Sequence, residues 1–191
     1  AKQIAYTHNY TMQTGINNVR GWETLAVPFI VTRISHAQRG EIVPFGKELS
    51  EDQQLPRFWL RELQADGFVP TTTIQAHVPY VISMPNNTVV YPDEYNLNGR
   101  ITFSAENTTV PATPELEEMV VLRGDIAMMP NYRYIPQNEY IYAINVSQPR
   151  ERYAEGSVFT RNLRDVRPFE AYTTHADVNG ARPNNIRIAP Q

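Results

Sequence analysis

The stretch Phe58–Gln75, FWLRELQADGFVPTTTIQ, carries the clearest local structural signal in this chain of 191 residues. Its central dipeptide, Asp66-Gly67, is typical of a type I′ turn, which needs two residues that tolerate positive φ angles. Apolar residues recur on both sides of this dipeptide. The pattern therefore predicts a β-hairpin that pairs Phe58–Ala65 with Phe68–Gln75.

In this predicted register, Trp59 lies opposite Ile74 and Leu63 lies opposite Pro70. Side chains alternate between the two faces of a strand. One face of the hairpin then carries most of the apolar side chains, namely Trp59, Leu63, Ala65, Phe68 and Ile74. The other face is mostly polar and is expected to contact water. Trp59 is therefore predicted to pack in the core rather than to present its ring to a ligand.

Similar strand-like runs occur on both sides of the hairpin. Trp22–Val31 (WETLAVPFIV) alternates apolar residues onto one face, and Pro28 predicts a bulge or an edge position in it. Pro79–Met84 is almost entirely apolar, and Arg100–Ala105 alternates apolar with polar residues. Further strands are expected at Met119–Leu122, Ile126–Met129, Tyr140–Val146, Val166–Thr173 and Asn185–Ala189.

The composition favours strands over helices throughout the chain. Val, Ile and Thr total 46 residues, whereas Leu occurs only 9 times, and β-branched residues pack well on pleated sheets. The 15 prolines interrupt long helices, so one short helical turn at Pro114–Glu118 is all that we expect. No Gly/Ser-rich linker or repeat divides the chain. These features predict an all-β fold, a two-sheet antiparallel β-sandwich (jelly-roll-like) with minimal helix, as a single domain over residues 1–191.

The composition also excludes several classes of function. The absence of cysteine rules out disulfides, Cys-ligated metals and a thiol nucleophile. A net charge of −3 and a pI near 5.8 give no reason to expect nucleic acid as a partner. The longest stretch without charged residues, Phe68–Pro92, is too polar for a membrane-spanning segment. The chain begins at Ala1-Lys2, so we expect that any targeting segment has been removed.

Several motifs occur in the order seen in a known family. Gly21–Phe29 (GWETLAVPF) resembles the GW-x-TL-x-(L/V)-PF opening of an all-β domain in surface and secreted proteins of Bacteroidetes-type bacteria. Ile74–Ile82 (IQAHVPYVI) looks like its I-x-A-x-x-PY-(L/V/I)-I element, and Ile101–Ser104 (ITFS) is similar to the strand that follows. Tyr142–Asn145 (YAIN) and Arg167–Tyr172 (RPFEAY) resemble its closing pair of motifs.

This resemblance covers most of the chain, from about Gly21 to Tyr172. It implies an all-β module near the C-terminal end of a larger exported protein, at the bacterial cell surface or secreted. The partners that it implies are other modules of the same parent protein. It carries over no catalytic residues, because the shared residues are mainly apolar or proline. The segment Gln3–Asn18 matches nothing in the family.

Catalytic and metal-binding patterns are weak in this sequence. The four histidines lack metal-ligand spacing, and no phosphate-binding loop or nucleophile elbow occurs, so we expect no metal site and no cofactor. A glycosidase would need two carboxylates that flank a cleft. The glutamates on or near predicted strands are Glu62, Glu94, Glu106, Glu139 and Glu170. Alternation places most of them on solvent faces, so no enzyme is predicted, although a glutamate pair in a cleft would favour one.

Tyrosine supplies the strongest candidates for ligand binding. Tyr132 and Tyr134 are two residues apart, as are Tyr140 and Tyr142, so each pair would share a face of an extended strand. Aromatic rings beside Arg and Asn can stack on sugars, but the same spacing also suits core packing. We therefore take Tyr132, Tyr134 and Trp22 as candidate ligand-binding residues.

Two functions follow from these observations. The leading hypothesis is a non-catalytic structural or adhesion module of an exported cell-surface protein, with a glycan or a host or cell-surface protein as a further partner. The alternative is a carbohydrate-binding module that presents a tyrosine-rich sheet face. Joint exposure of Tyr132 and Tyr134 would favour the second hypothesis.

Overall fold

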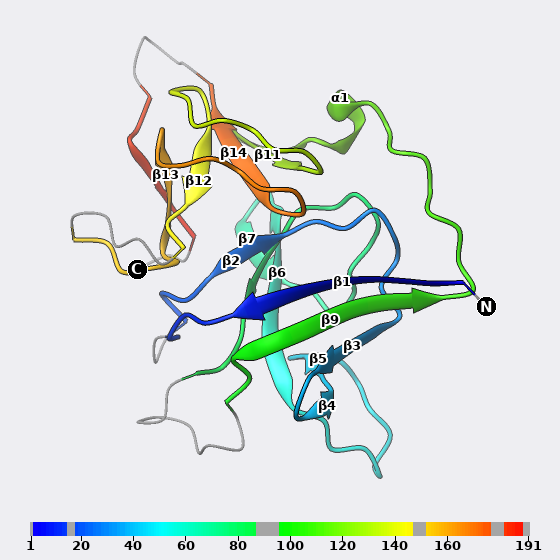
Figure 1. The fold of residues 1–191 in the computed structure, drawn as a ribbon. Helices are drawn as coiled ribbons and strands as arrows, with labels where there is room; N and C mark the ends of the chain where they lie inside the picture. The colour runs from blue at the N-terminus through cyan, green and yellow to red at the C-terminus, as the bar shows by residue number, and fades with distance from the viewer. Residues whose placement is uncertain (1, 15–17, 87–95, 147–151, 177–181, 189–191) are drawn as a thin grey trace.

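The computed structural model describes residues 2–14, 18–86, 96–146, 152–176 and 182–188. Within these ranges the regular structure consists of three β-sheets and one short helix, α1 (Leu116–Met119) (Figure 1). The predicted all-β, sandwich-like fold is confirmed, with three sheets where two were expected. In the part of the chain that the structure describes, no helix is long and apolar enough to cross a membrane.

The four-stranded sheet contains the N-terminal strand. Its order is β1 (Gln3–Tyr10), β9 (Gly99–Glu106), β3 (Arg33–His36) and β4 (Gly40–Glu41). All pairs in it are antiparallel, and β1 and β9 pair along their full length (Figure 1). The predicted alternation in β9 is confirmed, because Ile101, Phe103 and Ala105 are all buried.

The five-stranded sheet contains the segment that predicted the hairpin. Its order is β2 (Glu23–Leu25), β8 (Tyr80–Ser83), β6 (Arg57–Gln64) and β5 (Val43–Pro44), and β7 (Gly67–Pro70) also pairs with β6. The strand predicted over Trp22–Val31 ends three residues before Pro28, at the edge of this sheet.

The hairpin forms, but its register differs from the predicted one by two residues. Leu63 pairs with Phe68, so the loop is Ala65-Asp66 and Gly67 belongs to β7. The physical reason lies in the backbone. A type I′ turn needs positive φ at both central residues, and only Gly67 has one, at 114°. The turn is therefore followed by a glycine in a bulge-like position.

The register difference also changes the partner of Trp59. Strand β7 ends at Pro70, and β8 then runs beside β6, so that Trp59 lies opposite Ser83 instead of Ile74. Trp59 and Leu63 still face the same apolar cluster, because a shift of two residues keeps every side chain on its face.

The six-stranded sheet is formed by the C-terminal half of the chain. Its order is β10 (Val121–Arg123), β11 (Ile126–Pro130), β14 (Ala171–His175), β12 (Tyr142–Ile144), β13 (Val158–Arg161) and β15 (Asn185–Arg187), all antiparallel. This sheet lies at the opposite side of the molecule from β3 and β4 (Figure 1).

Two clusters of buried apolar side chains join the sheets. One joins the four- and five-stranded sheets and includes Phe103 and Ile82. The other joins the five- and six-stranded sheets and includes Val81 and Phe159. The five-stranded sheet is therefore a middle layer that is buried on both faces. This explains why Pro79–Met84 is almost continuously apolar instead of alternating.

Candidate functional site

The three candidate residues from the sequence lie in different surroundings. Trp22 has no exposed surface, and its indole Nε1 donates a hydrogen bond of 2.7 Å to the carbonyl oxygen of Asn18. Tyr132 is half-buried, with its hydroxyl 2.9 Å from Nδ1 of His77. Tyr134 is 58 % exposed. The structure therefore does not bring the three rings together on one exposed face.

Irregular backbone explains why the tyrosines separate. Tyr132 and Tyr134 follow β11, which ends at Pro130, and neither belongs to a strand. The rule that residues two apart share a face holds only in extended strands. Tyr140 and Tyr142 separate for the same reason, since β12 begins at Tyr142, which is fully buried, while Tyr140 is 61 % exposed.

Tyr134 lines a pocket of about 540 Å³, here called the charged pocket. Strands β1 and β2 form one side of it, and the segment that leads into β14 forms much of the other. Its lining residues are Tyr6, His8, Glu23, Thr24, Tyr134, Val146, Arg164, Asp165, Arg167, Pro168 and Glu170. Pockets of this volume are typical of small-molecule binding sites.

Strand β1 contributes a hydrogen-bonded pair of side chains to the pocket. The Tyr6 hydroxyl lies 3.4 Å from Nδ1 of His8, whose Nε2 lies 2.8 Å from Oε1 of Glu23 on β2. Glu23 is nearly buried, with 7 % of its surface exposed. A phenol, an imidazole and a carboxylate therefore form a chain along the pocket wall.

The surroundings shift the pKa values of both β1 side chains. Burial lowers the pKa of His8, but the hydrogen bond to Glu23 and the negative charges of Glu23 and Glu170 outweigh it, so that the pKa is raised overall. Burial, with the charges of the same two carboxylates, raises the pKa of Tyr6 to about 12. At neutral pH Tyr6 is therefore a neutral hydrogen-bonding group, and His8 holds its proton to a higher pH than a free imidazole does.

An arginine–carboxylate pair forms the opposite wall. Arg164 donates two hydrogen bonds to Glu170, from Nη2 to Oε1 at 2.8 Å and from Nη1 to Oε2 at 3.0 Å. The guanidinium also donates to the carbonyl oxygen of Ile144, and the backbone N–H of Arg167 donates 2.7 Å to Glu170. Bidentate pairs of this kind fix geometry as well as charge, so this wall is preorganised.

Backbone contacts hold this wall against β2 and β1. The N–H of Ala26 donates 3.0 Å to the carbonyl oxygen of Phe169, and the Thr24 hydroxyl exchanges hydrogen bonds with the backbone of Ala171. Phe169 has a φ of 70°, unusual for a residue other than glycine, and its ring centroid lies 4.6 Å from that of Tyr6. Contacts with β1 and β2 therefore fix the position of the segment 164–170, which precedes β14.

The rim of the pocket carries Tyr134, Asp165 and Arg167. The Tyr134 hydroxyl donates to Asp165, and the N–H of Gln137 donates 2.8 Å to the same carboxylate. These two hydrogen bonds lower the pKa of Asp165, which is a carboxylate at neutral pH. Arg167 is exposed, and no carboxylate among the described residues lies within salt-bridge distance of its guanidinium. Arg164 is already paired with Glu170, so Arg167 is the arginine of this pocket whose guanidinium N–H groups can bind a ligand.

The sequence pointed to one of the two glutamates in this pocket. Glu170 was among the candidates near strands, whereas no motif singled out Glu23. Of the other four candidates, none lines the charged pocket among the described residues, and Glu94 lies outside the described ranges. Tyr6 and His8 come from the segment with no family resemblance. The alternation of larger side chains along β1, QIAYTHNY, is the signal that could have placed them on one face.

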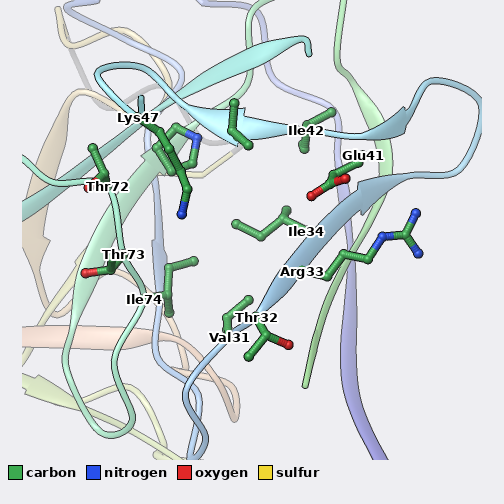
Figure 2. A pocket seen from close by; sticks show the side chains of 12 residues that line it. Val31, Thr32, Arg33, Ile34, Glu41, Ile42, Lys47, Thr72, Thr73 and Ile74 are labelled. Atoms are coloured by element: carbon green, nitrogen blue, oxygen red, sulfur yellow. The ribbon is translucent and has the colours of Figure 1, made fainter. Parts of the chain in front are cut away.

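A second pocket, of about 70 Å³, lies between β3 and the segment 72–74. Figure 2 shows Ile34 and Ile42 pointing into it, while Arg33 extends away from it. Its volume is well below the several hundred Å³ of an ordinary ligand site, so it offers no comparable binding space.

The described residues contain no group of three or more His, Cys, Asp or Glu side chains arranged to hold a metal ion. Comparison with protein-family models, curated proteins and solved structures found no match to this chain. The resemblance to the Bacteroidetes domain therefore stays a prediction, and the proposals below rest on the geometry of the charged pocket.

Proposed function

We propose that this chain is a non-catalytic adhesion module of an exported bacterial cell-surface protein, and that it binds a carbohydrate in the charged pocket. The observation that carries the proposal is the pocket itself. Its volume of about 540 Å³ accommodates one or two sugar rings, and its lining combines exposed Tyr134 with several charged hydrogen-bonding groups. Sugars offer hydroxyl groups to such side chains and ring faces to aromatic ones.

The charges of the pocket favour an acidic sugar. Glu23 accepts a hydrogen bond from His8, and Glu170 is paired with Arg164, so both carboxylates already have hydrogen-bond donors. Arg167 is left without a carboxylate partner among the described residues. A guanidinium binds a carboxylate through two parallel hydrogen bonds. A uronic or sialic acid would place its carboxylate on Arg167 and a ring face beside Tyr134.

The experiment is isothermal titration calorimetry with glucuronate, galacturonate and N-acetylneuraminate, each compared with glucose or galactose. Arg167→Ala should weaken binding of the acidic sugar about tenfold or more, because a charged hydrogen bond contributes about 1.5–3 kcal/mol. Binding of neutral sugars should change much less. Tyr134→Ala should weaken both kinds several-fold, since aromatic contacts contribute about 1 kcal/mol.

Two matched variants control for general effects. Tyr140→Ala removes a tyrosine that is as exposed as Tyr134 but does not line the pocket, and Arg33→Ala removes an exposed arginine on β3. Both should bind like the wild type. Absence of binding for every sugar would reject the carbohydrate proposal and leave a purely structural module as the function.

The Glu23–Glu170 pair also favours a second candidate, a glycoside hydrolase, since both carboxylates line one pocket. A hydrolase needs one carboxyl group free to deliver a proton to the leaving group. Here Glu23 accepts a hydrogen bond from His8 and Glu170 accepts two from Arg164, which suits binding a ligand better than transferring a proton to it. Release of reducing sugar from an oligosaccharide that binds would decide for the enzyme, and intact oligosaccharide would decide for the binding module.

A further inference from the structure

A third pocket, of about 230 Å³, lies beside β13 and β15 and is here called the arginine pocket. It shares no lining residue with the charged pocket. Its lining residues are Val19, Arg152, Tyr153, Ala154, Ser157, Val158 and Arg187. Arg187 is held by the sheet, because it lies on β15 and pairs with Val158 of β13, whereas Arg152 lies in the turn that precedes β13.

The two arginines converge on one phenol ring. The guanidinium carbons of Arg152 and Arg187 each lie 5.6 Å from the centroid of the Tyr153 ring. Interaction with the two guanidinium groups lowers the pKa of the Tyr153 phenol. Two guanidinium groups beside one ring, together with the lowered pKa of that phenol, show that the local potential is positive.

Among the described residues, no acidic group lines the pocket or pairs with either arginine to balance these charges. The lining contains no Asp or Glu, and neither arginine forms a salt bridge within the described residues. Two guanidinium groups that share one neutral ring repel each other, and an anion between them replaces this repulsion with attraction. The Ser157 hydroxyl already donates a hydrogen bond of 2.6 Å to the carbonyl oxygen of Ala154. The hydrogen bonds to a bound anion would therefore come from the two arginines.

We propose that the arginine pocket binds a tetrahedral oxyanion, as the phosphate or sulfate group of a small ligand. Guanidinium groups match the oxygens of such anions with paired hydrogen bonds. The volume holds one such group with a few further atoms, and Val19 and Val158 supply apolar surface for those atoms. The site stands independently of the carbohydrate proposal, because it uses different residues and a different anion.

The test is a titration of the whole chain with inorganic phosphate, with sulfate, and with acetate as a planar anion, at constant ionic strength. Calorimetry measures affinity, and nitrogen-edited NMR of the arginine side-chain N–H groups locates the site. We expect saturable binding of phosphate, of sulfate or of both, with shifts at Arg152 and Arg187. Whichever of the two binds more tightly identifies the class of ester. Arg152→Gln or Arg187→Gln should weaken binding about tenfold or more.

Arg33→Gln, which removes the same charge from an exposed position on β3, should leave binding unchanged. Equal losses in Arg33→Gln and Arg187→Gln would show general charge attraction and overturn the proposal. So would saturation by acetate alone, or the absence of shifts at Arg152 and Arg187 in the wild type. The NMR result needs no variant, so it decides the question even if a substitution prevents folding. Arg167→Ala should leave oxyanion binding intact, which separates this site from the charged pocket.

Discussion

Trp22 and Tyr134 are both aromatic candidates from the sequence, yet they lie in regions built in opposite ways. Around Trp22 the contacts are made largely by the backbone. The backbone N–H of Trp22 donates a hydrogen bond of 2.9 Å to the carbonyl oxygen of Gly156, and the indole ring is fully buried. Around Tyr134 the contacts are made by side chains, many of them charged, and the ring is mostly exposed.

The region around Trp22 stabilises the fold, whereas the region around Tyr134 is available for binding. The Trp22 region excludes water and joins two sheets, so its residues are constrained by packing. The charged pocket keeps Tyr134 and Arg167 exposed at its rim, where a substitution should change stability little. Substitutions should therefore have their largest effect on stability in the first region, and substitutions at the rim of the charged pocket should mainly affect ligand binding.

The largest expected effect is that of Trp22→Ala. Removing a fully buried indole from the cluster between the five- and six-stranded sheets should cost about 3–5 kcal/mol of unfolding free energy. Chemical denaturation measures this loss. Trp59→Ala is the matched control, since Trp59 is only partly buried against the same cluster, and its loss should be smaller. Equal losses would contradict the distinction between the two indoles.

Gly156→Ala should rank second. Gly156 has a φ of 67°, and a Cβ there would lie 2.5 Å from the backbone nitrogen of Trp22. The left-handed backbone alone costs a non-glycine residue about 1–3 kcal/mol, and the clash adds to it. Gly124→Ala is the control, because Gly124 has a φ of 56° with nothing within 4 Å of the added Cβ. If the two variants lost equal stability, close backbone packing at Trp22 would not be the cause.

A pH-dependent effect is expected from His8. The pKa of His8 in the folded chain is raised above its ordinary 6.5, so the protonated form favours folding. Its contribution to stability is complete below about pH 6 and is lost as the pH rises through the folded pKa. Subtracting the unfolding free energies of His8→Gln from those of the wild type isolates this group from the other histidines. The difference should decrease toward pH 8, and a constant difference would rule this pair out as a pH-dependent contributor.

The smallest effect on stability is expected for Tyr134→Ala. Because Tyr134 is 58 % exposed and lies in irregular backbone, its loss should leave Tm within about 2 °C of the wild type. Differential scanning calorimetry measures this. The same variant should lose sugar affinity, so stability and binding would separate. A large drop in Tm would instead place Tyr134 among the residues that hold the loop into β14.

The sequence alone predicted the fold class and several strands, but it did not predict β1, β3, β4, β5 or β13. The excess of β-branched residues predicted an all-β chain, and alternation placed Ile101, Phe103 and Ala105 in the core. These properties are local, since they depend on rotamer freedom and on the two-residue period of a strand. The family resemblance was not tested by the structure or the comparisons.

The hairpin register, the number of sheets and the candidate site depend on long-range contacts and could not be predicted from the sequence. Register follows from the φ angles at a turn, and the dipeptide at 66–67 is compatible with more than one turn type. The charged pocket joins His8 of β1, Glu23 of β2 and Glu170 before β14, which are far apart in sequence. The proximity of these three side chains depends on long-range pairing of strands, which local sequence patterns do not predict.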